Sequence, residues 1–390
     1  MTETTKKELK EGFNKVTVVG TLVEKNFEDT FFTNQQGERV DQIKGTISIR
    51  TGENEVHQVK LESNKLNKEG KENGLAKGYN TVRTEFVSVA DVAEGTNKLA
   101  KLNGVKDDSG EGLVYSYDEA VKVLNKQSFD TKFVANPTDK IDVLEKDGLF
   151  TYKVQYVKND ENNQPLYRIT IEASQVSVDG SLITNEYYGQ DGQLKQYQQI
   201  KGRFVNRLRE TDDKTPKAQF EIDIFVDKVR PEMKDGEETG RAIVEAWVPT
   251  YSLIFPYKFV VVEEGSDFFL NSLERGQTLK VYGNNLNVRK ETIKLVEAAF
   301  GSPIEEKTVT YVSESLINNA KVPYEEDSAN SFKPELVKER LTKREIRLEQ
   351  QKTKKQGGAS KSDNRPNAFG TPSNTAPKKE DPKVDISKYF

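Results

Sequence analysis

A repeated pattern of short segments constrains the fold of this chain more than any other feature of the sequence. Residues 16–22 (VTVVGTL) return as residues 176–182 (VSVDGSL), with glycine at the same place. Residues 41–45 (DQIKG) return as residues 198–202 (QQIKG), and a pair of aromatic residues followed by a polar turn stands between the two segments in both places. A repeat of this length predicts two copies of a domain rather than the units of a solenoid.

Each copy has the pattern of a small antiparallel barrel. Alternating apolar and polar residues, broken by Gly, Asn and Asp, indicate strands and turns. A glycine inside a strand often marks the bend that a closed five-stranded barrel needs. In the second copy residues 277–283 are expected to close the barrel, and in the first copy the closing strand is either residues 80–89 or residues 140–144.

The expected fold is mainly β: two tandem five-stranded barrels with small helical insertions, a charged C-terminal helix and a disordered tail. Helices are expected at residues 116–124, where a capping-box spacing precedes an apolar run, and at residues 289–300. The expected organisation is an N-terminal arm (1–12), a first domain with a helical insertion (13–160), a second domain (165–302), a connecting segment (303–333), a charged helix (334–356) and a tail (357–390).

The composition argues against most catalytic chemistry. The chain has no cysteine and a single histidine, His57, so it lacks disulfides, thiol nucleophiles and Cys/His zinc sites. We find no phosphate-binding loop, no HExxH motif and no GxGxxG motif after a strand, and His57 is interpreted as a half-buried strand residue. We therefore expect neither an enzyme nor a bound cofactor or metal. The polar N-terminus and the absence of a long apolar run lead us to expect a cytoplasmic chain without a membrane partner.

Cations on the second strand of each copy suggest contacts with a polyanion. Alternation in the second copy places one face toward the core and the other, with its basic residues, toward solvent. The candidate phosphate contacts are Lys44, Arg50, Lys201, Arg203 and Arg207. An open alternative is that Arg203 and Arg207 pair with the carboxylates of the neighbouring segment 219–227 across the sheet.

Aromatic residues beside these cations suggest base stacking. Phe31 and Phe32, and likewise Tyr187 and Tyr188, lie in the connection from the first to the second strand of their copy, and adjacent side chains of an extended chain point opposite ways. Trp247 is a further candidate, although its aromatic cluster is also expected to supply core. Rings next to cations are what a sequence-tolerant site for single-stranded nucleic acid needs; the alternative is that the rings only cover a barrel end.

Charge is divided unevenly along the chain. The net charge is −4, but after residue 333 Lys and Arg outnumber Asp and Glu by 14 to 8, which leaves −10 on the preceding part. An acidic folded part disfavours nonspecific duplex binding, whereas a local basic groove still binds a single strand because distant charges are screened. The basic helix and tail are expected to add electrostatic affinity.

Two segments resemble bacterial single-stranded DNA-binding proteins. Residues 14–22 (NKVTVVGTL) look like their opening strand, and the Gly/Ser/Asn/Pro-rich tail that ends in residues 384–390 (VDISKYF) looks like their linker and tip. The size and the doubled barrel resemble the larger versions carried by bacteriophages of Gram-positive hosts. The resemblance implies OB folds, binding and protection of single-stranded DNA in phage replication, recombination or repair, and a tip that recruits replication or recombination proteins.

The tip of the tail departs from the family pattern. Lysines at 383 and 388 interrupt its acidic run, and tyrosine stands where the family has proline. The candidate partner-binding residues are Asp385, Ile386, Tyr389 and Phe390. The alternatives to a nucleic-acid binder are a non-catalytic β protein for protein interaction or structure with a basic docking tail, and a carboxylate-metal nuclease that no motif supports. DNA or RNA preference, site size and oligomeric state stay open.

Overall fold

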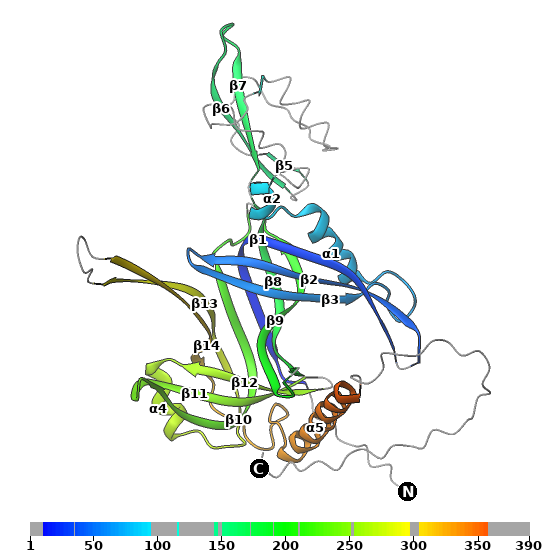
Figure 1. Ribbon diagram of the computed structural model, residues 1–390, viewed down its shortest axis with the longest axis vertical. Helices are drawn as coiled ribbons and strands as arrows, with labels where there is room; N and C mark the ends of the chain where they lie inside the picture. Colours follow the sequence, from blue (N-terminus) through cyan, green and yellow to red (C-terminus); the bar gives the residue numbers. More distant parts are fainter. Residues whose placement is uncertain are drawn as a thin grey trace, which may run out of the picture.

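The computed structural model confirms a mainly β chain with few helices (Figure 1). The structure describes residues 11–34, 36–94, 115–116, 144–146, 150–171, 173–189, 191–209, 211–250, 253–296 and 304–357. No helix in these ranges is long and apolar enough to cross a membrane.

Five strands form a first closed circuit. They are β1 (Asn14–Thr33), β2 (Arg39–Gly52), β3 (Glu55–Asn64), β8 (Gln175–Tyr188) and β9 (Leu194–Arg207). The first three strands form an antiparallel meander, β9 pairs with β3 in parallel, and β8 pairs antiparallel with both β9 and β1. Helices α1 (Gly74–Glu85) and α2 (Val89–Glu94) follow the third strand. This is the Greek-key order of an OB fold.

Five further strands form a second circuit with the same order. They are β10 (Lys217–Lys234), β11 (Glu237–Pro249), β12 (Ile254–Val261), β13 (Thr278–Val296) and β14 (Ile304–Ala320). The strands β10, β11 and β12 form the meander, β14 pairs in parallel with β12, and β13 pairs antiparallel with β14 and β10. Helix α4 (Glu263–Asn271) again follows the third strand.

The registers show that the two circuits are equivalent residue by residue. Val16 faces Gly180 in the first circuit as Phe220 faces Gly283 in the second. Each of these glycines marks a register shift, and a Cβ added there would collide with a backbone carbonyl of the fifth strand. Val16 and Phe220 also pair with each other between the circuits, so the antiparallel β1–β10 contact lies on a local two-fold axis.

The strand pairing corrects the expected domain boundaries. Residues 176–182 were expected to open a second barrel, but they lie in β8, the fourth strand of the first circuit, and pair with β1. The true second copy starts at β10. The first and fourth strands look alike because they are neighbours on the same core and each contains a glycine at a tight backbone approach, Gly20 and Gly180.

One apolar core passes through both circuits, and a helix covers part of each. Ile43, Ile47 and Ile49 on β2 point inward, as their alternation predicts. Helix α1 begins at the N-cap Asn73, whose side chain accepts from the backbone N–H of Leu75, and it buries Tyr79 in the first core. Helix α4 contributes Phe269 to the same continuous cluster.

Two further elements leave the circuits. A separate antiparallel sheet contains β4 (Tyr115–Ser116), β5 (Leu144–Lys146), β6 (Phe150–Asn159) and β7 (Pro165–Ile171), and Figure 1 shows its long hairpin projecting beyond α2. The charged helix expected at residues 334–356 is confirmed as α5 (Pro334–Gly357).

Three other expectations meet different outcomes. The helix expected at residues 289–300 is wrong, because residues up to Val296 continue strand β13, whose long hairpin with β14 supplies the backbone partners. Residues 304–320 of the expected connecting segment are strand β14. The helix expected at residues 116–124 lies outside the described residues except for Ser116, which ends β4. The N-terminal arm up to residue 10 and the tail after residue 357 also lie outside the described residues.

Candidate functional site

Three adjoining clefts form a continuous depression that we call the polar groove. The outer cleft lies on β1, β2 and β3 with volume about 550 Å³, the middle cleft between the two circuits measures about 460 Å³, and the inner cleft beside β11 and β12 about 650 Å³. The outer and middle clefts share Lys60, Asn185 and Gln199. The middle and inner clefts share residues that include Tyr197 and Tyr257. The groove therefore runs from the outer face of the first circuit to the junction of the two circuits.

Lysines lie around the outer cleft. The register places Lys44 opposite Glu62 on β3 and places Lys60 beside Lys201 on β9. The Glu62 carboxylate lies 3.3 Å from the Lys44 Nζ and 3.9 Å from the Lys201 Nζ, while the Lys60 Nζ donates to the Thr46 hydroxyl at 3.1 Å. All these charges are at the surface, where ion pairs are weak and readily exchanged. The Glu28 carboxylate also lines this cleft, so the three lysines and the two carboxylates leave one net positive charge for an anionic ligand.

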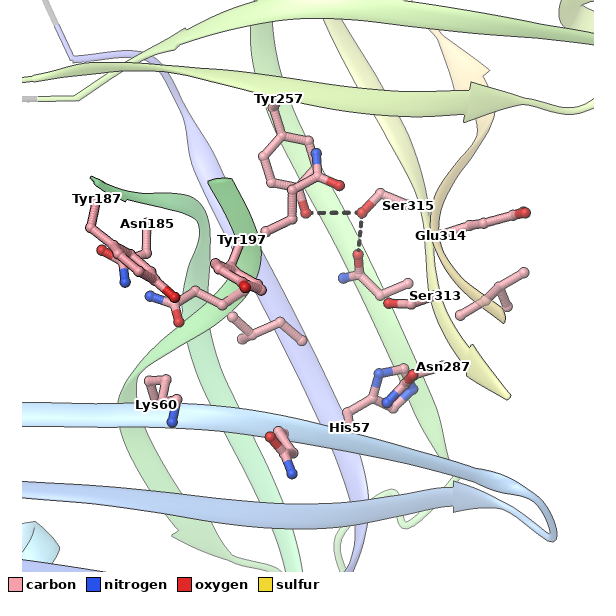
Figure 2. A pocket seen from close by; sticks show the side chains of 16 residues that line it. His57, Lys60, Asn185, Tyr187, Tyr197, Tyr257, Asn287, Ser313, Glu314 and Ser315 are labelled. Atoms are coloured by element: carbon pink, nitrogen blue, oxygen red, sulfur yellow. Dashed lines mark hydrogen bonds between the residues drawn. The ribbon is translucent and has the colours of Figure 1, made fainter. Parts of the chain in front are cut away.

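Two stacked tyrosines line the middle cleft. The rings of Tyr187 on β8 and Tyr197 on β9 lie 5.7 Å apart at an interplanar angle of 10° (Figure 2). Both side chains are exposed, at 37% and 52%, so their outer faces are accessible. A hydrogen bond with Tyr197 is the main cause that raises the pKa of Tyr187, which keeps the phenol neutral. Sequence reasoning missed Tyr197. The turn at Gly192 is the signal that could have found it, because a β8–β9 hairpin folded at this turn brings Tyr197 opposite Asn185.

Amide side chains dominate the rest of the groove. They have both donors and acceptors, which suit the edges of uncharged polar ligands. The amides that line the three clefts are Asn26, Gln58, Asn185, Gln196, Gln198, Gln199, Asn285 and Asn287. Figure 2 shows Asn185 next to Tyr187 and Asn287 next to His57 on opposite sides of the middle cleft.

A bulge changes the cationic strand that the sequence predicted. Asp179 pairs with Phe204 but Gly180 pairs with Gly202, so Arg203 is the extra residue on β9. One extra residue moves every following side chain to the other face of a strand. Phe204 is consequently exposed at 48%, and the partly buried Arg207 has a guanidinium nitrogen shielded from solvent. The expected outward row of cations on this strand is therefore right for Lys201 and Arg203 and wrong for Arg207.

The alternative pairing of these arginines is not seen either. The segment 219–227 belongs to β10, which pairs with β1, β11 and β13 rather than with β9. Its carboxylates have other partners: Glu221 contacts Lys280 at 2.9 Å and Asp227 contacts Arg275 at 2.8 Å. Arg203 instead lies over the Phe204 ring, 5.2 Å from its centroid.

The remaining aromatic candidates lie apart from the groove. Phe31 and Phe32 are exposed near the tip of the β1–β2 hairpin, with the Arg39 guanidinium 4.2 Å from the Phe31 centroid, and neither lines the three clefts. Tyr188 points away from Tyr187, as alternation requires, and Lys352 of α5 lies over its ring. Arg50, at the other end of β2 from Lys44, is likewise absent from the cleft linings.

The structure contradicts the prediction that Trp247 stacks on a base. The residue borders the inner cleft, but it is only 5% exposed and packs with Val337 and Leu341 of α5. The Arg344 guanidinium lies 5.3 Å from the ring centroid. The structure places this ring in the core between α5 and the second circuit, where it offers no free face to a base.

Helix α5 is fixed beside the groove by a buried ion pair. The Glu186 carboxylate accepts from the Arg344 Nε at 2.9 Å, and it also contacts Arg347 at 3.2 Å and the Gln196 amide at 2.9 Å. The side chains of Glu186 and Arg344 are 1% and 3% exposed. Because Glu186 precedes Tyr187 in β8, this contact fixes the strand that presents the stacked tyrosines.

The site offers cations, rings and amides rather than a reactive group. His57 is 3% exposed instead of half-buried, and burial is the main cause that lowers its pKa. Among the described residues no group of three or more His, Cys, Asp or Glu side chains is placed to hold a metal ion. The partner-binding candidates Asp385, Ile386, Tyr389 and Phe390 lie outside the described residues.

The solved structures that this chain is similar to include two crystal structures of the single-stranded DNA binding protein from Thermus aquaticus. The wild-type protein has TM-score 0.35 at 10% identity, covering 82% of this chain and 96% of that one. A deletion mutant has TM-score 0.32 at 11% identity, covering 82% and 98%. Scores this low leave the strand pairing above as the basis for the fold.

Comparison of the sequence identifies the family. No curated protein matches the chain. The family model described as YorF matches residues 12–152 and 151–354, which together span most of the sequence. This chain belongs to the YorF family.

Proposed function

We propose that the protein binds and protects single-stranded DNA without strong sequence preference, along the polar groove. The observation that carries the proposal is the continuity of this groove, from the lysines of the outer cleft to the stacked tyrosines of the middle cleft. In OB folds the face of the second and third strands, together with the loops after the first and fourth strands, binds oligonucleotides. The groove starts on β2 and β3 and reaches the β8–β9 hairpin, which carries Tyr187 and Tyr197.

The phosphates of the bound strand contact Lys44, Lys60 and Lys201. Surface lysines that share Glu62 exchange this weak pairing for a phosphate at little loss. Each phosphate neutralised releases a condensed counterion, so affinity falls with salt in proportion to the number of contacts. Arg203, Arg207 and Arg50 are not needed for this arrangement.

Bases stack on the exposed faces of Tyr187 and Tyr197. Stacking on an aromatic ring contributes about 1–3 kcal/mol per base and accepts any base, because every base has a π-face. In duplex DNA the base faces are covered by their neighbours, so these rings favour an unpaired strand. A bound DNA strand that continues along the β1–β2 hairpin would also contact the exposed Phe31 and Phe32.

Replication, recombination and repair, in a bacteriophage as the sequence resemblance suggests, are the processes we propose for this activity. They are the processes that expose unpaired DNA. The proposed partners are single-stranded DNA and, through Asp385, Ile386, Tyr389 and Phe390, replication or recombination proteins. The groove has no catalytic role in this account.

Binding of labelled oligothymidylate, duplex DNA and RNA to the full chain, titrated with salt, tests the proposal. We expect tight and salt-sensitive binding to the single DNA strand and weaker binding to the duplex. Absence of binding to all three would instead favour the alternative of a β protein for protein interaction, with its basic tail as a docking arm.

A further inference from the structure

The middle cleft contains a fixed hydrogen-bond donor that the proposed binding of phosphates and ring faces does not use. Asn285 lies on β13 of the second circuit and is only 8% exposed. Its Oδ1 accepts from the Ser315 hydroxyl at 2.8 Å, and the Ser315 oxygen lies 2.9 Å from the Tyr257 hydroxyl. Figure 2 shows this chain of hydrogen bonds at the wall of the cleft.

The direction of these hydrogen bonds fixes the orientation of the amide. Ser315 has one hydroxyl proton and donates it to Asn285, so Tyr257 must donate to Ser315. Burial raises the pKa of Tyr257, which keeps its hydroxyl protonated. Because Oδ1 faces Ser315, the Asn285 Nδ2 protons point away from Ser315. The Nδ2 group has no hydrogen-bond partner among the described residues.

A buried donor without a partner needs an explanation, because leaving it unsatisfied is unfavourable. Asn285 lines the middle cleft together with Tyr187 and Tyr197, whose rings offer flat apolar faces. On the opposite wall His57 is also buried, and its Nε2 lies 3.2 Å from the Glu55 carboxylate without hydrogen-bond geometry. A cleft of about 460 Å³ is within the size range of small-molecule sites.

The charge of the cleft favours a neutral ligand group over a phosphate. Lys60 is the lysine among its described lining residues, and the Glu314 carboxylate lines the same cleft. Glu314 is itself held by Arg241 at 3.1 Å. A phosphate would therefore meet as much negative as positive charge here, whereas at the outer cleft Lys201 adds a cation beside two lysines and two carboxylates.

We propose that the middle cleft is a base-reading pocket, in which Asn285 Nδ2 donates to a carbonyl oxygen of one unstacked nucleobase. Thymine has such carbonyl oxygens, and adenine has none and would bring its amino donor against the donor of Asn285. The inference rests on the proposed function and adds to it a preference for thymine over adenine at one position of the bound strand.

Competition binding on the full chain tests this pocket. Oligothymidylate and oligoadenylate of equal length compete for the protein against one labelled single strand, and the readout is the ratio of their affinities. We expect a ratio of about three- to tenfold in favour of thymidylate, which is the range of one net hydrogen bond. The ratio should fall toward one in Asn285→Asp, which keeps the acceptor for Ser315 but lacks the donor.

Two further variants separate the pocket from general effects. Asn318→Asp adds the same charge at an exposed position on β14 outside the clefts, and it should keep the wild-type ratio. Tyr257→Phe removes the hydroxyl that fixes Ser315, so the ratio should fall part of the way, and this variant carries the test if Asn285→Asp does not fold. An unchanged ratio in both cleft variants would overturn the pocket.

The two proposals fail in different ways. If the wild-type protein binds neither oligonucleotide, the proposed function itself is wrong. Self-stacking of the adenylate is controlled by a series of thymidylate oligomers that carry a single adenine at each position in turn. If the wild-type protein binds all of these and oligothymidylate equally, single-strand binding stands and the base-reading pocket is overturned.

Discussion

At the scale of single residues, the groove depends on a few side chains whose neighbours determine their roles. Lys44, Lys60 and Lys201 come from three neighbouring strands, and the Glu62 carboxylate bridges Lys44 and Lys201. Tyr187 lines the middle cleft, whereas the next residue, Tyr188, points to Lys352 of α5, because successive strand side chains lie on opposite faces. Such roles follow from register, which sets the face on which each strand residue lies.

The lysines should determine the salt dependence of single-strand binding. Replacement of Lys60 or of Lys201 by Ala should reduce the slope of log affinity against log salt by about 0.7 for each phosphate that is no longer neutralised. Fluorescence anisotropy of a labelled oligothymidylate over a range of salt measures this slope. Lys77→Ala on the exposed face of α1 is the matched control and should leave the slope unchanged. Equal slopes in all four proteins would remove these lysines from the interface.

The stacked tyrosines should supply affinity that salt does not remove. Tyr197→Ala should weaken single-strand binding by about 1–3 kcal/mol per stacked base, and Tyr197→Phe should retain most of it because the ring remains. Titration at high salt, where phosphate contacts are weakened, isolates this contribution. Phe204→Ala removes an equally exposed ring outside the clefts and serves as the control. A decrease in affinity in Phe204→Ala as large as that in Tyr197→Ala would contradict the assignment.

At the scale of elements, α5 and β8 act as one unit. The buried pair of Glu186 and Arg344 connects them, and Val337 and Leu341 pack against Trp247. A buried ion pair adds little net stability over an apolar pair, but removal of one partner leaves an uncompensated charge. The contact therefore fixes the position of the helix more than it stabilises the whole chain.

Removal of one partner of this pair should lower the free energy of unfolding more than removal of both partners. Arg344→Leu should lower the free energy of unfolding by up to about 3–5 kcal/mol, since the buried Glu186 loses its main partner and keeps only Arg347 and Gln196. The double variant Glu186→Leu, Arg344→Leu should recover much of that stability. Chemical denaturation of the three proteins measures both effects. A double variant no more stable than Arg344→Leu would show that the carboxylate is not the cause.

The sequence predicted elements well where the pattern is local. Alternation placed Ile43, Ile47 and Ile49 in the core, and the helix formers after Pro334 predicted α5. Residues 289–300 were mistaken for a helix because their apolar spacing is ambiguous, and only the partner strand β14 decides it. The row of arginines on β9 failed for a similar reason, since nothing local signals the bulge at Arg203.

At the scale of the whole molecule, two equivalent five-stranded circuits meet across a local two-fold axis at Val16 and Phe220. The sequence predicted a duplication, but it paired the first strand with the fourth strand of the same circuit. The long segment between β3 and β8 hides the true connection, because strands far apart in sequence form the same barrel. Equivalent circuits have nevertheless diverged: Tyr187 and Tyr197 of the first are exposed at the middle cleft, while Trp247 of the second packs under α5.

The glycines of the two fourth strands should be equally necessary. In each circuit a Cβ at this glycine would collide with a carbonyl of the fifth strand, Lys201 for Gly180 and Leu316 for Gly283. Gly180→Val and Gly283→Val should each destabilise the fold by about 1–3 kcal/mol or more, which is the range expected for overpacking. Thermal unfolding measures this effect, with Gly78→Val at an open position of α1 as the control for valine itself. A protein that tolerates either substitution as well as Gly78→Val would contradict the equivalence of the circuits.

Binding along the polar groove is tested by the salt dependence of affinity for single-stranded and duplex DNA, measured on the wild-type chain and on the combined variant Lys44→Ala, Lys60→Ala, Lys201→Ala. We expect tight single-strand binding by the wild type, a shallower salt slope in the variant, and little duplex binding by either protein. Equal affinity for single strand and duplex, or the same slope in the two proteins, would contradict the proposal.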